Sequence, residues 1–162
     1  MSYAKEPLDA QRSLERLQRL CVRQEKCLSD VRRKLSLWGV GKEDAAKVEQ
    51  LLLAAKFVDE ARYAAAFVRE KSRLSRWGAL KIRAALQAKR LPAAVVAEAL
   101  AQLDGEQAAQ NLLADLQRKA KTIRATSPQE LRAKLIRFGV SRGYGYEQVV
   151  RTATLAMEMG QP

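Results

Sequence analysis

Apolar residues recur along almost the whole chain at intervals of three and four, which is the spacing of one face of an α-helix. The alternation of apolar and polar residues that is typical of a β-strand is almost absent. Only 8 Gly and 4 Pro interrupt the periodic segments. Ala, Leu, Lys, Arg, Glu and Gln, which all favour helices, dominate the sequence. The pattern therefore predicts an all-α protein.

Breaks in the apolar pattern divide the chain into about nine helices, most of them short. Cap residues and first-turn prolines give the expected starts. The first three helices are expected from Pro7 and Asp9 to about Cys27, from an N-cap at Ser29 to just before Gly39 and Gly41, and over Glu43–Ala55. The next three are expected from an N-cap at Asp59 to Lys71, from Ser75 to Arg90, and from Pro92 onward. The last three are expected from Asp104 to Lys121, from Ser127 and Pro128 to the loop GVSRGYGY, and over Tyr146–Met157. Glu130, three residues after Ser127, gives the pattern of a capping box.

A short motif recurs three times. The copies are VRRKLSLWGV from Val31, IRAALQAKRL from Ile82 and LRAKLIRFGV from Leu131. In each copy an apolar residue and a Leu at i and i+4 share one stripe of a helix. One helix is predicted before each copy and one after it. The motif therefore predicts three tandem three-helix repeats, over residues 1–57, 58–103 and 104–162.

A three-helix unit of about 50 residues buries little core by itself. The repeats are therefore expected to pack against their neighbours and to form an elongated molecule. Because the repeats supply packing partners to one another, we expect a monomer.

Positive charge is concentrated in one segment. The chain has 30 Lys and Arg against 18 Asp and Glu, a net charge of +12, which favours an anionic partner. Residues 62–90 hold nine of the basic residues and a single acid, Glu70. Six of these nine are Arg, whose forked guanidinium suits phosphate or carboxylate. The alternative is a solvated helix face that keeps the protein soluble.

The sequence offers no catalytic or metal-binding arrangement. It has no His, no Gly-rich phosphate loop and no nucleophile elbow. Cys21 and Cys27 lie on different faces of the predicted helix, which disfavours a disulfide, and no other ligands accompany them for zinc. We therefore expect no enzyme, no cofactor and no metal. The absence of a long apolar run and of a secretory signal predicts a cytoplasmic protein without a membrane span.

Residues 57–91 contain, in this order, Asp59-Glu60, Arg62-Tyr63-Ala64, the basic run Arg69 to Arg76, Gly78, Ile82 and Leu86. With these elements the segment resembles the middle repeat of the RecX regulatory proteins of bacteria. The segments CVRQEKCLSDVRRKLSLWGV and KLIRFGVSRGYGYEQV are similar to other parts of the family, so the likeness spans residues 15–155. One departure is Arg90, which stands where the family carries Gly and disfavours a left-handed helix end there.

The resemblance implies three-helix repeats of a modified helix-turn-helix type. It also implies a partner, because RecX-like proteins lie in the groove of RecA recombinase filaments on single-stranded DNA. There they suppress strand exchange, ATP hydrolysis and co-protease activity, and some also bind DNA. The resemblance therefore predicts a non-enzymatic regulator of RecA. The alternative is a helix-turn-helix-type protein that acts directly on single- or double-stranded DNA.

We expect the basic segment to supply the partner-binding surface, with Trp77 as an apolar anchor. The predicted residues are Arg69, Lys71, Arg73, Arg76, Trp77, Lys81, Arg83, Lys89 and Arg90. They cannot all face one way, since Lys81 and Arg83 lie about 200° apart on a helix. Some of these side chains are therefore expected to serve the fold or to face solvent.

Overall fold

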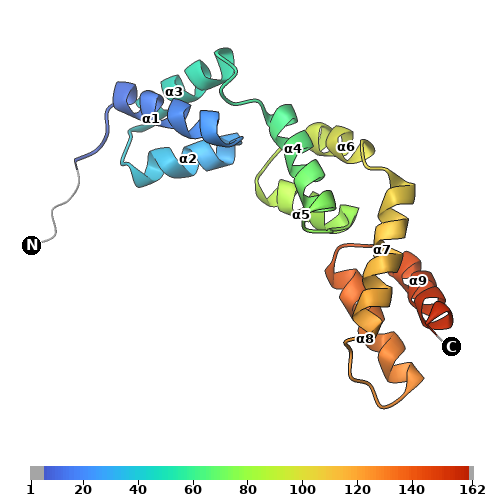
Figure 1. Cartoon of the computed structure of the whole chain (residues 1–162). Coiled ribbons are helices and arrows are strands. Elements are labelled where there is room, and N and C mark those ends of the chain that lie inside the picture. The colour runs from blue at the N-terminus through green and yellow to red at the C-terminus, as the bar shows by residue number, and fades with distance from the viewer. Residues whose placement is uncertain (1–5, 161–162) are drawn as a thin grey trace, which may run out of the picture.

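The computed structural model describes residues 6–160, and this part of the chain contains nine α-helices and no strand (Figure 1). The helices are α1 Ala10–Arg23, α2 Leu28–Leu37, α3 Lys42–Ala54, α4 Glu60–Arg73, α5 Ala79–Ala88, α6 Ala93–Ala101, α7 Gly105–Ala120, α8 Pro128–Ser141 and α9 Tyr146–Met159. They follow one another in three groups of three along an arc, with the two chain ends at opposite ends of the molecule (Figure 1). The predicted all-α, elongated architecture is confirmed.

The first helix of each group begins in the same way. Asp9, Asp59 and Asp104 occupy the N-cap positions of α1, α4 and α7. The carboxylate of each cap accepts a hydrogen bond from the backbone N–H three residues later, at Arg12, Arg62 and Gln107. These bonds satisfy amide groups that have no partner inside the helix. The caps predicted at Asp59 and Asp104 are thus present.

Three predicted helix limits in the first two groups are wrong. α1 ends at Arg23 and does not continue to Cys27. Cys27, and not Ser29, is the N-cap of α2, and Gly78, and not Ser75, is the N-cap of α5. Serine is a favourable cap, but this preference alone does not decide which of several neighbouring residues begins the helix.

The capping box predicted at the start of α8 is half formed. The Ser127 hydroxyl accepts the N–H of Glu130 at 3.1 Å, as expected. The Glu130 carboxylate accepts the backbone N–H of Thr126 at 2.8 Å instead of that of Ser127. Hydrogen bonds from Lys134 and Thr126 lower the pKa of Glu130 to about 2. The reciprocal bond has therefore moved one residue outward from the cap.

The third copy of the motif is displaced by one helical turn. The buried pairs on the middle helices are Val31 and Leu35, Ile82 and Leu86, and Leu135 and Gly139. Leu131, which the motif aligned with Val31, is only half-buried. Moreover, α8 continues through Ser141, into the segment predicted as a loop. An i, i+4 pattern looks almost the same after a shift of one turn, so the sequence did not reveal the displacement.

Each middle helix ends with a residue in the left-handed conformation. These residues are Gly39 (φ 69°), Arg90 (φ 60°) and Gly143 (φ 96°). In each case the next N–H bonds back to the carbonyl five residues earlier, as the pair Leu91 and Leu86 does at 3.4 Å. This is the Schellman arrangement, in which Gly is strongly favoured. The expectation for Arg90 was therefore wrong, because the turn persists although its residue carries a side chain.

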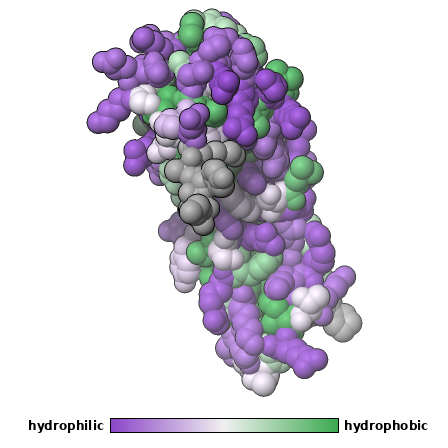
Figure 2. Space-filling view, turned by 90° about the vertical axis from the view of Figure 1, so that its left-hand side faces the viewer, coloured by the Kyte–Doolittle hydropathy of each residue, from purple (hydrophilic) through white to green (hydrophobic). Residues whose placement is uncertain are grey.

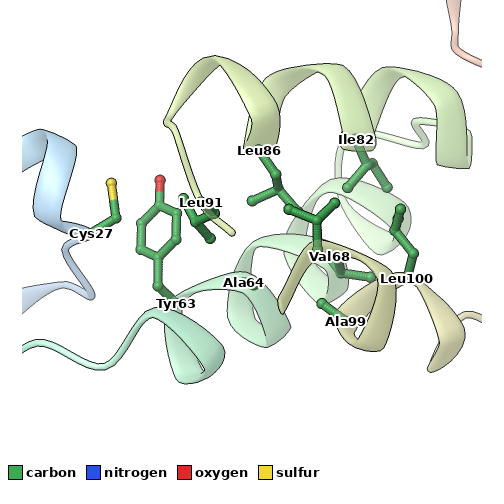
Figure 3. Close-up of a cluster of buried hydrophobic side chains, with 10 residues drawn as sticks. Cys27, Tyr63, Ala64, Val68, Ile82, Leu86, Leu91, Ala99 and Leu100 are labelled. Atoms are coloured by element: carbon green, nitrogen blue, oxygen red, sulfur yellow. The ribbon is translucent and has the colours of Figure 1, made fainter. Parts of the chain in front are cut away.

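Three clusters of buried side chains form the core, one in each group of helices. One residue crosses between groups: Cys27, which precedes α2, lies in the cluster of the second group beside Tyr63 and Leu91 (Figure 3). Burial raises the pKa values of the Cys27 thiol and of the Tyr63 hydroxyl. The clusters accord with three repeats, whose limits at 57/58 and 103/104 stay a prediction.

The second and third groups meet end to end through their backbones. The N–H of Gly78, at the start of α5, donates to the carbonyl of Arg142 at 2.7 Å, and Leu80 N–H donates to Gly143 at 3.0 Å. The unpaired amides at the start of one helix thus satisfy carbonyls at the end of another. A Cβ atom on Gly78 would lie 2.5 Å from the Gly143 carbonyl carbon. Glycine is therefore required for this close approach.

We predict that Arg90→Gly stabilises the protein. The left-handed conformation costs an ordinary residue about 1–2 kcal/mol, and the greater backbone freedom of unfolded glycine offsets part of the gain. The free energy of unfolding in urea should rise by about 0.5–1 kcal/mol. Ala84→Gly, at an exposed position in the interior of α5, should instead lower it by about 1 kcal/mol. A decrease for both variants would contradict the assignment of strain to Arg90.

We predict that Gly78→Ala weakens the junction between α5 and α8. The added methyl group has to displace backbone atoms, so unfolding in urea should become easier by about 1–3 kcal/mol. Small-angle X-ray scattering should show a larger radius of gyration. Gly105→Ala is the matched control, because a Cβ atom there meets nothing within 4 Å. Equal effects of the two substitutions would show that the contact at Gly78 is unimportant.

Candidate partner-binding surface

Four of the nine predicted residues are exposed arginines that have no ion-pair partner in the part of the chain that the structure describes. Arg69 and Arg73 lie on the C-terminal half of α4, Arg83 lies on α5, and Arg90 follows α5. Within residues 6–160 their guanidinium groups make no ion pair. Each can therefore bind an external carboxylate or phosphate without first breaking an internal contact.

Trp77 and two lysines of the segment form a cation–π cluster. The Nζ atom of Lys81 lies 4.5 Å from the centroid of the Trp77 ring, and that of Lys71 lies 5.0 Å from it. The Phe67 ring meets the same indole edge-on, with 6.4 Å between centroids. Trp77 is half-buried and packs on the second core cluster. The indole is thus held by neighbours of its own repeat, and it presents two cations at the rim of that cluster.

Arg76 joins the second group of helices to the third. Its guanidinium binds both carboxylate oxygens of Asp115 on α7, at 3.0 and 3.2 Å, and the side-chain oxygen of Asn111 at 3.0 Å. The Asp115 side chain is only 12% exposed. Arg76 also has a left-handed backbone (φ 58°), which aims its side chain across the junction at a cost in strain. The structure therefore gives Arg76 a joining role, and its predicted partner contact stays untested.

Lys89 makes the corresponding link toward the first group. Its ammonium group lies 2.6 Å from the Asp30 carboxylate on α2, whose side chain is 13% exposed. Burial would raise the pKa of Asp30, but hydrogen bonds from Lys89 and Cys27 hold it below its usual value. At the same junction Arg62 donates to the Glu25 carboxylate at 2.6 Å. Polar contacts thus hold the first joint together, in addition to the packing of Cys27 in the second cluster.

Sequence reasoning missed the acidic partners of these two cations. Asp115 and Asp30 are separated from Arg76 and Lys89 by 39 and 59 residues along the chain. Both carboxylates occur on helices that otherwise follow an ordinary amphipathic pattern, so nothing local marks them. The signal that the sequence offers is that both are acids flanking the apolar stripe of a helix, where they face a neighbouring repeat.

Among residues 6–160 there is no group of three or more His, Cys, Asp or Glu side chains that could hold a metal ion. In the same range no helix has the length and apolar character needed to span a bilayer. Hydrophilic side chains cover most of the face shown in Figure 2, and hydrophobic ones lie between them in small groups. The second repeat presents its exposed arginines together with Leu74 and Leu80, which are 81% and 52% exposed.

The chain was compared with known families and proteins. Family models for the second and third three-helix domains of RecX match residues 59–100 and 106–152. A regulatory protein RecX from Chromohalobacter salexigens is 37% identical over 142 residues, which cover 86% of this chain and 90% of that relative. The chain belongs to the RecX family. Members of this family are named regulatory proteins.

Other relatives give the same family with different coverage. Two regulatory proteins RecX from Clostridium botulinum strains are each 34% identical, and the chain spans 60% and 55% of their lengths. The crystal structure of RecX from Lactobacillus salivarius has the same fold, with a TM-score of 0.80 at 15% identity over 93% of this chain and 97% of that one. A second RecX crystal structure has a TM-score of 0.81 at 18% identity, over 92% of this chain and 73% of that one. The family's three-helix repeats are thus confirmed for this chain.

We predict that the joint at Asp30 weakens in acid. A carboxyl group whose pKa is lowered by folding stabilises the protein above its ordinary pKa of 3.8, and this contribution is lost as the pH falls through the lowered value. The free energy of unfolding should therefore decline below about pH 5. The variant Asp30→Asn should be less stable at pH 7, and its free energy of unfolding should fall less steeply as the pH is lowered. Glu158→Gln, at an exposed position, should behave like the unchanged protein; an equally shallow decline there would contradict the assignment to Asp30.

Proposed function

We propose that the protein is a non-enzymatic regulator that binds RecA recombinase filaments on single-stranded DNA and inhibits their recombinase, ATPase and co-protease activities. Membership of the RecX family supports a regulatory role. The observation that carries the binding part of the proposal is the set of four exposed, unpaired arginines on the second repeat. An elongated molecule with such a surface suits a long anionic partner better than a small-molecule substrate.

The ion pairs of the basic segment narrow the set of residues that are expected to contact the filament. Arg69, Arg73, Arg83 and Arg90 are available for charge-assisted hydrogen bonds. Arg76 and Lys89 are already engaged at the joints, so changing them would disturb the arrangement of the repeats as well as any contact. Reversing the charge of unpaired residues is therefore the cleaner test of binding.

We predict that the protein inhibits RecA-dependent ATP hydrolysis on single-stranded DNA when it is titrated in well below the RecA concentration. Arg69→Glu combined with Arg83→Glu should weaken this inhibition about tenfold or more, since each charge-assisted hydrogen bond contributes about 1.5–3 kcal/mol. Helical circular dichroism should not change, because neither guanidinium holds the fold.

The matched control is Arg137→Glu combined with Arg151→Glu. Both residues are exposed on the third repeat, and neither forms an ion pair within residues 6–160. This control changes the net charge equally and should leave inhibition intact. No inhibition by the unchanged protein, together with salt-sensitive binding to bare DNA, would contradict the proposal and favour direct action on nucleic acid.

A further inference from the structure

The first helices of repeats 1 and 2 carry the same arginine pattern. α1 and α4 both have 14 residues, and both begin after an Asp cap, at Asp9 and Asp59. A shift of 50 residues superposes Arg12 on Arg62, Arg19 on Arg69 and Arg23 on Arg73. Residues separated by 7 and by 11 positions lie on one face of a helix. The two helices therefore present the same basic face.

The C-terminal arginine pair of each helix is unpaired. Arg12 and Arg62 contact acids, at Asp9 and Glu25. Arg19 and Arg23, like Arg69 and Arg73, are exposed and form no ion pair within residues 6–160. An i, i+4 pair places the two side chains about 5–6 Å apart at their Cβ atoms. Each pair thus forms a compact dication that nothing inside the described chain neutralises.

Each arginine pair lines a cleft beside the linker that leads to the next repeat. The first cleft, of about 480 Å³, is lined by Gln18, Arg19, Val22 and Arg23 of α1 and by Phe57 of the α3–α4 linker. The second, of about 730 Å³, is lined at the equivalent positions by Val68, Arg69, Ser72 and Arg73 of α4 and by Leu103 of the α6–α7 linker. The same four helix positions therefore face a linker with an apolar side chain in both repeats.

The third repeat lacks this feature. Counted from its cap Asp104, the equivalents of Arg69 and Arg73 are Ala114 and Arg118. The Arg118 guanidinium binds the Asp115 carboxylate at 2.6 Å. Among the described residues, the arginine-lined cleft thus occurs in the first and second repeats, in each case beside the linker to the following repeat.

The lining favours a protein segment over a phosphate backbone. Val22 is 77% exposed at the first cleft, and Leu80, which lines the second, is 52% exposed. A sugar-phosphate backbone offers these side chains only the C–H groups of its sugars, whereas a peptide can supply a whole apolar side chain beside its carboxylates. Each cleft also contains one acid, Glu15 or Asp104. Both acids accept hydrogen bonds from their own helix, and within residues 6–160 neither forms an ion pair with the arginines.

We propose that the two clefts bind two copies of one kind of segment, an extended acidic peptide in which acidic and apolar residues alternate. In an extended chain, alternate residues lie about 6.6 Å apart on one side, which matches an i, i+4 arginine pair. The acids would face the arginines, and the apolar residue between them would face Phe57 or Leu103. A partner built from repeating subunits presents such a segment twice; its identification with a recombinase filament rests on the proposed function.

The test uses the isolated full-length chain and the peptide Gly-Asp-Phe-Asp-Gly, followed by amide chemical shifts in NMR. We expect saturable shifts around both Arg19–Arg23 and Arg69–Arg73. Arg19→Gln with Arg23→Gln should weaken binding about tenfold at the first cleft only, and Arg69→Gln with Arg73→Gln about tenfold at the second only. Arg137→Gln with Arg151→Gln is the control and should change neither.

A peptide of the same composition with adjacent acids, Gly-Asp-Asp-Phe-Gly, should bind about tenfold more weakly, because only one acid can then face the arginine pair. Equal binding of the two peptides, binding at one cleft only, or no peptide binding would overturn the proposal. An oligothymidylate that shifts the same amides when the peptide does not would assign the clefts to nucleic acid. Because RecA is absent from this titration, its failure is distinct from a failure to inhibit RecA.

Discussion

The arrangement of the second and third repeats depends on a contact between two helix ends. The first amides of α5 donate to the last carbonyls of α8, and Gly78 and Gly143 bring the two backbones together. Units of about 50 residues bury small cores, so the contacts at the joints are important for holding the repeats together as one molecule. Here the joint satisfies polar groups that both helices would otherwise leave to solvent. The paired ends of the helices leave little freedom to slide, and this fixes the cleft between the repeats.

This constraint also explains part of the charge of residues 62–90. Arg76 crosses the junction to Asp115, and Lys89 crosses the other junction to Asp30. In both pairs the acid is the more buried partner. Removing Lys89 would leave the Asp30 carboxylate poorly solvated, whereas Asp115 would keep its ion pair with Arg118. The middle repeat has two neighbours, and it therefore supplies cations to both. The arginines that remain exposed are those with no neighbour to reach.

The sequence was sufficient for the helices because their apolar stripes and Asp caps are local features. It was insufficient wherever two distant segments decide the outcome. The partners of Arg76 and Lys89 lie 39 and 59 residues away, and no local pattern marks them. The one-turn displacement in α8 was not detected from the sequence, because the apolar stripe of a helix looks the same after a shift of one turn. At Arg90 the preference for glycine in a left-handed turn led to a wrong prediction, since the packing of Leu91 in the second core outweighs the local strain.

The internal repeat has a consequence for how strongly the chain can bind. One arginine pair in an open cleft makes a weak contact, since exposed ion pairs contribute little and salt screens them. Two such clefts in one chain act differently, because binding at the first makes binding at the second intramolecular. The gain is realised only when the partner offers two segments at the spacing that the joints impose. A joint that keeps the repeats at a fixed distance therefore converts two weak contacts into selectivity for a repeating partner over isolated copies of its subunit.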